Sequence, residues 1–200
     1  MALLGIAAFL LAAYLMGSLP SGYVICRWVA NIDVRTVGSK NIGATNVARS
    51  LGSNWGLLVL VTDMAKGALP VLLALSIWSG GTERNLLIVA LVALAAFFGH
   101  LFSAFLSFTG GKGVATAFGI SLVLMPKAAL VSFVIFLLVT WIWRYVSLGS
   151  LSALLTLPAW TALTGYDSFY LGITFVFALS VVIRHRSNIR ALLQGQERKI

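Results

Sequence analysis

The chain has 200 residues, of which 60% are hydrophobic and only 10% are charged, and its mean hydropathy is +1.00. Such a composition excludes a water-soluble globule, so we expect residues 1–200 to form one polytopic membrane domain, all α-helical. Lys and Arg number 14 against 5 Asp and Glu, giving a formal net charge of +9. Because these cations lie in short stretches between apolar runs, we expect them to meet anionic membrane lipids or an anionic substrate and not nucleic acid.

Seven apolar runs are long enough, or nearly so, to cross a membrane, which takes about 20 residues of helix. They are Leu3–Ile25, Trp55–Ile77, Leu86–Phe108, Val114–Met125, Ala128–Trp143, Val146–Leu163 and Phe169–Ile183. The first run has no cationic segment before it and Arg27 after it, so it is predicted to be a retained helix and not a secretory signal. The fourth run is short, and the glycine-rich segment before it either continues the helix or dips into the membrane.

The cations divide unevenly between the two sides that seven crossings define. One side receives Arg27, Arg35, Lys40, Arg49, Lys112, Arg144, Arg184, Arg186, Arg190, Arg198 and Lys199, whereas the other receives Arg84 and Lys127. By the positive-inside rule the crowded side is the cytoplasm, which places the N-terminus outside and the C-terminus inside. The polar clusters of the chain, at 38–49, 110–113, 144–147 and 185–188, then all face the cytoplasm.

The longest polar interruption in the first half of the chain is Gly38–Arg49. Its two glycines let backbone amides turn toward a ligand, and its hydroxyl and amide side chains donate hydrogen bonds beside the cations Lys40 and Arg49. These are the groups that hold an anion, above all phosphate. The alternative is an ordinary loop between two membrane helices, rich in turn-forming residues.

The second cluster, Gly110–Gly113, places Lys112 between glycines at the start of a helix. Backbone amides at a helix N-terminus attract an anion and the lysine adds a point charge, so phosphate binding is predicted for Gly110, Gly111 and Lys112. The segment is not a Walker A loop, because Gly113 replaces the hydroxyl residue that would hold magnesium. The alternative is a lysine that snorkels to the membrane interface.

Two further clusters lie in the second half of the chain. Arg144–Ser147 puts an arginine and a tyrosine at a helix end, which is also the composition of an ordinary interfacial belt. The arginines of Arg184–Arg190 either anchor the last helix or, together with His185 and Asn188, complete a site. Because His185 and Asn188 are three residues apart, we expect them to share one helix face.

Asp63 and Lys66 lie three residues apart inside the second apolar run. An ionisable residue there costs about 2.5–3.5 kcal/mol on insertion scales and is usually paired, so we expect an ion pair that supports the site from behind. Direct catalysis by this pair is the alternative. His100, near the cytoplasmic end of the third run, is either a hydrogen-bonded structural histidine or a supporting residue of the site.

No metal and no cofactor are predicted. The acids are too few for a magnesium site built on two carboxylates, and the two histidines are too far apart in sequence to show zinc-site spacing. The single cysteine, Cys26, excludes an internal disulfide and is expected to be a buried apolar filler. Phosphotransfer through a bound metal is therefore unsupported.

The clusters, in this order, resemble those of the bacterial integral-membrane acyl-phosphate glycerol-3-phosphate acyltransferases, the PlsY family. The matching stretches are Gly17–Pro20, Gly38–Arg49, Asp63–Gly67, Gly99–His100, Gly110–Thr116, Arg144–Leu148 and His185–Ile189. The resemblance covers nearly the whole chain. It implies a seven-helix fold with an outside N-terminus, in agreement with the distribution of cations.

The resemblance also implies transfer of a fatty acyl group from acyl phosphate to the 1-hydroxyl of glycerol 3-phosphate, which yields lysophosphatidic acid and phosphate. This first acylation step of phospholipid synthesis would take place at the bacterial cytoplasmic (inner) membrane, without a cofactor and with no protein partner identified. Carried over by position, the residues that line the phosphate and glycerol pocket are Ser39, Asn41, Thr45, Arg49, Lys112, Ser147, His185 and Asn188. The tail departs slightly from the expected pattern at Gly195-Gln196-Glu197, which leaves the role of Glu197 open.

The predicted mechanism is direct transfer. Acyl phosphate is already activated, and Ser39 has no adjacent base in the sequence that would make it a nucleophile. Neither histidine is followed four residues later by Asp, so the acid–base pair of many glycerolipid acyltransferases is absent. Lys112, Arg49 and the loop amides would balance the charge of two phosphates, and the hydroxyl proton would pass to the donor phosphate or to His185.

Two other classes of protein remain open. An anion or phosphate channel or transporter would use the same cations, although such proteins usually place them near the membrane midplane or around a pore. A scaffold for lipid-synthesising enzymes would tolerate alanine at Arg49 and Lys112.

Overall fold

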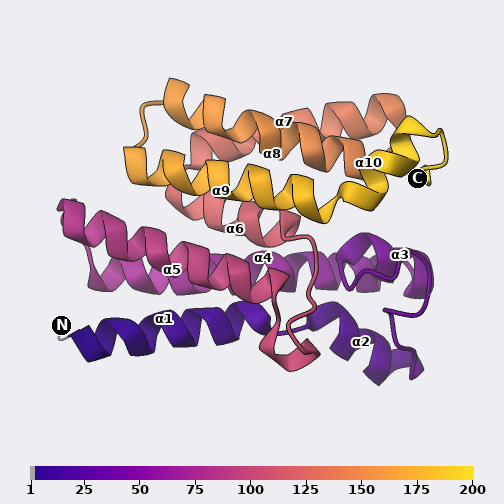
Figure 1. The fold of residues 1–200 in the computed structure, drawn as a ribbon, viewed down its shortest axis with the longest axis horizontal. Helices are drawn as coiled ribbons and strands as arrows, with labels where there is room; N and C mark the ends of the chain where they lie inside the picture. Colours follow the sequence, from indigo (N-terminus) through magenta and orange to yellow (C-terminus); the bar gives the residue numbers. More distant parts are fainter. Residues whose placement is uncertain (1–2) are drawn as a thin grey trace. The chain divides into compact units, whose positions relative to one another are not determined.

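A computed structural model describes residues 3–200, so the first two residues of the predicted domain lie outside it. The described residues form ten α-helices and one 3₁₀ turn, and none of them is in a β-strand (Figure 1). They divide into two compact units, the first ending at Ile120 and the second beginning at Ser121. The predicted all-helical class is confirmed.

Among the described residues, the first unit holds five helices, one 3₁₀ turn and the first residues of α6, and α6 continues into the second unit. They are α1 (Leu3–Ser18), α2 (Ser21–Ala30), α3 (Ala44–Leu51), α4 (Ser53–Ile77), α5 (Glu83–Leu101), the 3₁₀ turn η1 (Ala104–Leu106) and α6 (Val114–Leu124). Glycines bring α1 and α5 into close contact, because a Cβ atom on Gly17 would collide with the carbonyl of Ala96, and one on Gly99 with that of Tyr14. Small residues at such crossings are typical of packed membrane helices.

The first apolar run is not the single helix that was predicted. It breaks at Leu19–Pro20 into α1 and α2, which meet at a bend of 41°. Proline has no N–H to continue a helix, and a break frees carbonyls of the preceding turn. Side chains from other elements satisfy them, since Lys66 Nζ donates to the Leu19 carbonyl at 2.8 Å and Ser103 Oγ to the Ser18 carbonyl at 2.6 Å.

The third run also ends earlier than predicted. Helix α5 stops at Leu101, and residues 102–113 fold back in irregular conformation around η1. The amides of Phe108 and Gly110 donate to the carbonyls of Ser103 and Leu101, so this segment satisfies its own backbone without a helix. The glycine-rich segment therefore does not extend α6, and α6 itself matches the short fourth run to within one residue.

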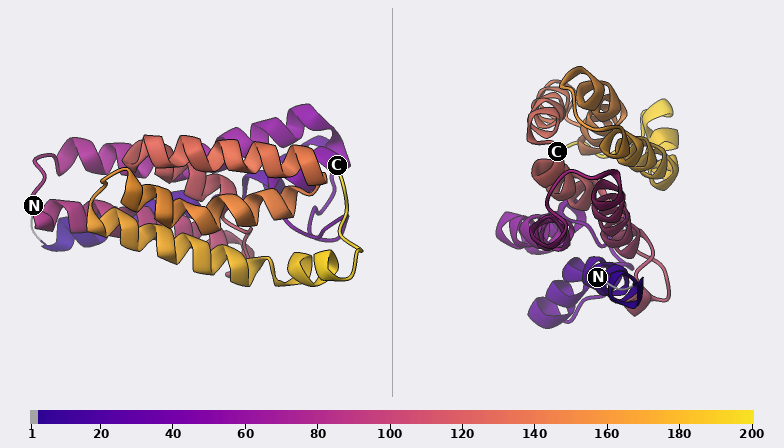
Figure 2. Two further views of the ribbon diagram at one scale, coloured as in Figure 1. Left: turned by 90° about the horizontal axis from the view of Figure 1, so that it is seen from above. Right: turned by 90° about the vertical axis from the view of Figure 1, so that its left-hand side faces the viewer.

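The second unit contains three long helices and one short one. These are α7 (Pro126–Trp143), α8 (Val146–Leu163), α9 (Ser168–Arg184) and α10 (Arg186–Leu193). Both views in Figure 2 show α7, α8 and α9 lying side by side. Each long helix lies within two residues of its predicted run at both ends, so those three predictions are confirmed.

Two short helices, α3 and α10, were not predicted. Both lie in polar segments, where a search for apolar runs has nothing to detect. Helix α10 follows α9 after a bend of 61° at His185, so the basic tail is partly helical.

Four helices of the described chain are long and apolar enough to cross a membrane, namely α4, α5, α7 and α8. The number rises to six if the bent pairs α1 with α2 and α9 with α10 each count as one span. Helix α6 has 11 residues, about 16 Å at 1.5 Å per residue, which is half the thickness of the hydrocarbon layer. A seventh crossing at α6 therefore stays a prediction.

Candidate active site

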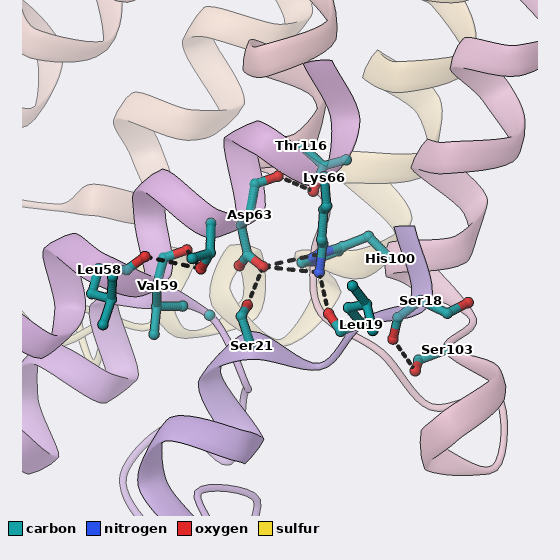
Figure 3. A network of polar contacts seen from close by, with 12 residues as sticks. Ser18, Leu19, Ser21, Leu58, Val59, Asp63, Lys66, His100, Ser103 and Thr116 are labelled. Atoms are coloured by element: carbon teal, nitrogen blue, oxygen red, sulfur yellow. Dashed lines mark hydrogen bonds and ion pairs between the residues drawn. The ribbon is translucent and has the colours of Figure 1, made fainter. Parts of the chain in front are cut away.

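The buried polar centre of the first unit is the carboxylate of Asp63 on α4 (Figure 3). Its Oδ1 atom lies 2.8 Å from Lys66 Nζ and accepts a hydrogen bond from Ser21 Oγ at 2.5 Å. His100 Nδ1 lies 3.8 Å from the same oxygen, a separation that allows electrostatic attraction but exceeds a hydrogen bond. Asp63, Lys66 and His100 are each at most 5% exposed, so the ion pair of Asp63 and Lys66 lies away from water.

This network ties together four segments of the first unit. Lys66 also donates to the Leu19 carbonyl in the break between α1 and α2, and Thr116 Oγ1 on α6 donates to the backbone carbonyl of Asp63 at 3.0 Å. Burial of two opposite charges is tolerable only when each is paired and hydrogen-bonded. The predicted ion pair between Asp63 and Lys66 is confirmed, whereas its role in support of a site is still a proposal.

Asn46 organises the loop that leads into α3. Its side chain is 2% exposed, its Nδ2 contacts the carbonyls of Val34, Val37 and Asn41 at 2.9–3.1 Å, and its Oδ1 accepts from the amide of Ser39. The side-chain amide of Asn46 thus bonds to four residues of the loop, a role that the sequence did not reveal. Asparagine is common in polar loops, and only the structure shows that this one is buried.

The loop presents its remaining polar groups outward. Gly38 and Lys40 both have positive φ, +59° and +56°, and a Cβ atom on Gly38 would collide with the Asn46 side chain, so this turn requires glycine. The predicted site residue Asn41 accepts from the amide of Gly43 at 2.8 Å, just before α3. Of the other predicted residues, Ser39 and Arg49 are exposed and Thr45 is half-buried.

An ion pair fixes the start of the same loop. The Arg35 guanidinium hydrogen-bonds the Asp33 carboxylate at 2.7 Å, lies 4.9 Å from the centre of the Tyr23 ring, and lowers the pKa of Asp33 to about 2. A depressed carboxyl pKa contributes to stability above its unfolded value and loses that contribution only as the pH falls toward 2. Asp33 therefore stays ionised and gives the loop no pH sensitivity near neutrality.

The second cluster lies against the end of α5. The amides of Gly110 and Gly111 donate to the carbonyls of Leu101 and His100 at 3.0 and 3.1 Å. Between Gly111 and Gly113 stands Lys112, which is half-buried. The structure thus places the predicted lysine directly after two residues that are held by backbone hydrogen bonds to the end of α5.

The segment before the glycine loop packs against the region of the first cluster. Leu106, which precedes the glycine loop, packs in one buried apolar group with residues on both sides of the Gly38–Arg49 segment and within it, namely Cys26, Val34, Ile42, Val47 and Val59. Figure 1 shows that the irregular segment after α5 reaches the junction between α1 and α2. The Gly38–Arg49 segment and the turn that precedes the glycine loop therefore share one apolar group, and Cys26 is the buried filler that was expected.

In the second unit, Glu197 connects the cluster at 144–147 with the cluster at 185–188. Its Oε1 atom accepts from Ser147 Oγ at 2.6 Å and from Asn188 Nδ2 at 2.8 Å. The tail is held further by Arg144, which donates to the Ile200 carbonyl at 2.8 Å, and by Lys199 over the Tyr145 ring at 5.6 Å. The sequence left Glu197 without a role, and no spacing signal connects residues 50 positions apart.

His185 caps both the end of α9 and the start of α10, so the expectation that it shares a helix face with Asn188 stays a prediction. His185 follows the last residue of α9, where Nδ1 contacts the Val181 carbonyl at 2.8 Å, and Asn188 lies in the first turn of α10. The chain bends by 61° between α9 and α10 at His185, whose carbonyl accepts from the amide of Ile189 at 2.8 Å. His185 is 2% exposed.

We expect Glu197→Ala to loosen the tail, because two donors lose a charged acceptor worth about 1.5–3 kcal/mol per bond. Cleavage by trypsin after Arg198 should become about tenfold faster, since proteolysis tracks the population of the open segment. Glu197→Gln keeps an oxygen acceptor and should stay within about threefold of the parent chain. Gln196→Ala is the matched control, and equal rates for Glu197→Ala and this control would contradict the assigned contacts.

The helices and buried networks define an integral membrane protein, and comparisons with known proteins place it in the acyltransferase class. A family model described as glycerol-3-phosphate acyltransferase matches residues 7–195. The chain therefore belongs to the glycerol-3-phosphate acyltransferase family.

Relatives and solved structures agree with this assignment. A glycerol-3-phosphate acyltransferase of Syntrophotalea carbinolica is 47% identical, and the match covers 95% of this chain and 95% of the relative. One of Fusobacterium nucleatum is 42% identical, and the match covers 96% of each of the two chains. Crystal structures of the integral membrane glycerol 3-phosphate acyltransferase PlsY match with TM-scores of 0.90 for the glycerol 3-phosphate form and 0.88 for the lysophosphatidic acid form. They share 37% and 36% sequence identity and cover 98% of this chain and 96% and 95% of theirs.

Proposed function

We propose that this acyltransferase moves a fatty acyl group from acyl phosphate to the sn-1 hydroxyl of glycerol 3-phosphate, giving lysophosphatidic acid and inorganic phosphate. The supporting observation is that the Gly38–Arg49 segment and the turn that leads into the Gly110–Gly113 loop pack in one buried apolar group through Ile42, Val47 and Leu106. The segment and the loop offer Lys40, Arg49 and Lys112 to anionic ligands. Two phosphorylated substrates call for such a concentration of positive charge.

The reaction balances without a covalent acyl-enzyme. The glycerol hydroxyl oxygen attacks the acyl carbonyl carbon, the bond from that carbon to the bridging phosphate oxygen breaks, and the new ester bond forms. The hydroxyl proton ends on the departing phosphate. Lys112, Arg49 and the loop amides hold the phosphates close together and offset their charge, and such positioning supplies several kcal/mol of barrier reduction.

We also propose substrate-binding roles for two residues of the second unit. Ser147 and Asn188 both donate to Glu197 Oε1. They orient the glycerol 3-phosphate or the candidate base, His185. Ser39, Asn41 and Thr45 bind substrate from the first loop. The acyl chain lies among the apolar helices, open to lipid.

The proposed setting is the bacterial cytoplasmic membrane, crossed seven times. The distribution of cations between loops supports an outside N-terminus and a cytoplasmic C-terminus. The polar segments then reach glycerol 3-phosphate from the cytoplasm.

If the donor phosphate accepts the proton, His185→Ala should keep substantial turnover, within about tenfold of the parent kcat at saturating substrates. The imidazole already contacts the Val181 carbonyl through Nδ1, which suits a structural role. The measurement is kcat at saturating concentrations of both substrates. A fall of about 10,000-fold would instead assign the base to His185.

The proposed function is tested with purified protein, palmitoyl phosphate and glycerol 3-phosphate. Phosphate release should require glycerol 3-phosphate and should match the lysophosphatidic acid formed, one for one. Protein in liposomes that moves phosphate across the bilayer, but releases none from palmitoyl phosphate, would support an anion transporter instead.

A further inference from the structure

His100 lies between the buried ion pair and the glycine loop. One side of the imidazole faces Asp63, with Nδ1 at 3.8 Å from Oδ1. The other side lies against Gly111, where an added Cβ atom would collide with Nε2 and approach Cε1 to 2.9 Å and Cδ2 to 3.2 Å. The ring therefore lies between the carboxylate and the loop, directly against Gly111.

The backbone around His100 shapes the same loop. Its carbonyl accepts from the Gly111 amide at 3.1 Å, and a Cβ atom on Gly110 would collide with that carbonyl. One residue after Lys112, Gly113 has a φ of +85°, and a Cβ atom there would approach Leu101 and Phe97 to 2.6 Å. The glycines on both sides of Lys112 thus lie directly against the end of α5, with no room for another side chain.

We propose that His100 is a positioning residue, which holds the Gly110–Gly113 loop against the Asp63–Lys66 pair and thereby sets Lys112 for the substrate phosphates. This inference rests on the proposed function. The carboxylate that faces the ring is itself held in place, because Asp63 Oδ1 contacts Lys66 Nζ and accepts from Ser21 Oγ. The ring in turn fixes the glycine next to the lysine, and a phosphate contact misplaced by about 1 Å can cost 100-fold in rate.

A purely structural histidine would give a different pattern of kinetics. Loss of its packing would lower the thermal stability of the protein and leave turnover by the folded fraction unchanged. A residue that acts through Lys112 must instead lower kcat/KM, and its effect must vanish once Lys112 is absent.

The first test is a double-mutant cycle between His100 and Lys112, with kcat/KM measured for glycerol 3-phosphate. We expect His100→Ala to lower kcat/KM about 30-fold in the parent protein but less than threefold in Lys112→Ala. Val92→Ala, at another fully buried position of α5, is the matched control for lost packing and should stay within threefold. Independent, multiplying effects of His100→Ala and Lys112→Ala would overturn the proposal.

The second test uses the contact with Gly111 and does not depend on activity. Gly111→Ala should lower the melting temperature or prevent folding, because the new methyl group meets the imidazole. In the double variant His100→Ala/Gly111→Ala the vacated space accepts the methyl group, so its melting temperature should return to that of His100→Ala alone. A double variant less stable than both single variants would overturn the contact.

The two proposals fail in distinguishable ways. Parent protein that releases no phosphate from palmitoyl phosphate would refute the proposed function, while the stability cycle with Gly111 would still measure the contact. Normal activity of the parent, combined with normal kcat/KM in His100→Ala, would refute only the positioning role.

Discussion

Lys112→Ala should lose at least about 100-fold in kcat/KM. The lysine sits in a loop whose glycines lie against α5 and His100, so its ammonium is held on a short, fixed segment. A group that offsets developing charge on an oxyanion or phosphate contributes about 3–4 kcal/mol to the transition state. Initial rates of phosphate release at varied glycerol 3-phosphate provide the measurement.

Two variants show whether this effect belongs to the site. Lys127→Ala removes an exposed lysine near the start of α7 and should leave kcat/KM within about twofold of the parent value. Lys112→Arg keeps the charge but changes its shape and reach, so we expect an intermediate loss of about tenfold. Near-normal turnover in Lys112→Ala would remove this residue from the mechanism.

Asp63→Asn should lower the free energy of unfolding by about 3–5 kcal/mol. The substitution removes the carboxylate partner of Lys66, whose side chain is only 5% exposed. Removing one partner of a buried ion pair is strongly destabilising, because the remaining charge stays buried without compensation. Reversible unfolding in mixed micelles measures the change. Combining it with Lys66→Met should restore most of the loss, since an apolar side chain of similar length leaves no charge to compensate.

Thr62→Val is the matched control for Asp63→Asn. Its hydroxyl donates to the Leu58 and Val59 carbonyls of its own helix, so we expect a loss below about 1 kcal/mol. Equal losses for Thr62→Val and Asp63→Asn would mean that the ion pair contributes no more than an ordinary polar side chain.

Apolar patterning predicted the long helices well. Helix α8 covers Val146–Leu163 as expected, because polar residues mark both of its ends. The same pattern failed at Leu19–Pro20 and at residues 102–108, which are apolar yet irregular. At Leu19–Pro20 a side chain from a distant segment satisfies the backbone, and no local pattern reports Lys66 on the Leu19 carbonyl.

The polar clusters were recognisable as clusters, but their internal contacts were not. Asn46 and Glu197 act through partners up to 50 residues away in sequence, and only folding brings those groups together. The pair formed by Asp63 and Lys66 was predictable because its two members lie one helical turn apart. Local spacing therefore predicts contacts along one helix and misses those between elements.

The proposal that the polar segments share the cytoplasmic side is tested most directly by labelling cysteines from one side. In a Cys26→Ala background, single cysteines at the exposed positions Lys40, Thr109 and Arg198 should react with a membrane-impermeant maleimide only after the cells are permeabilised. A cysteine at Gly81, between α4 and α5, should react in intact cells. Labelling of positions 40 and 109 from opposite compartments would contradict the account.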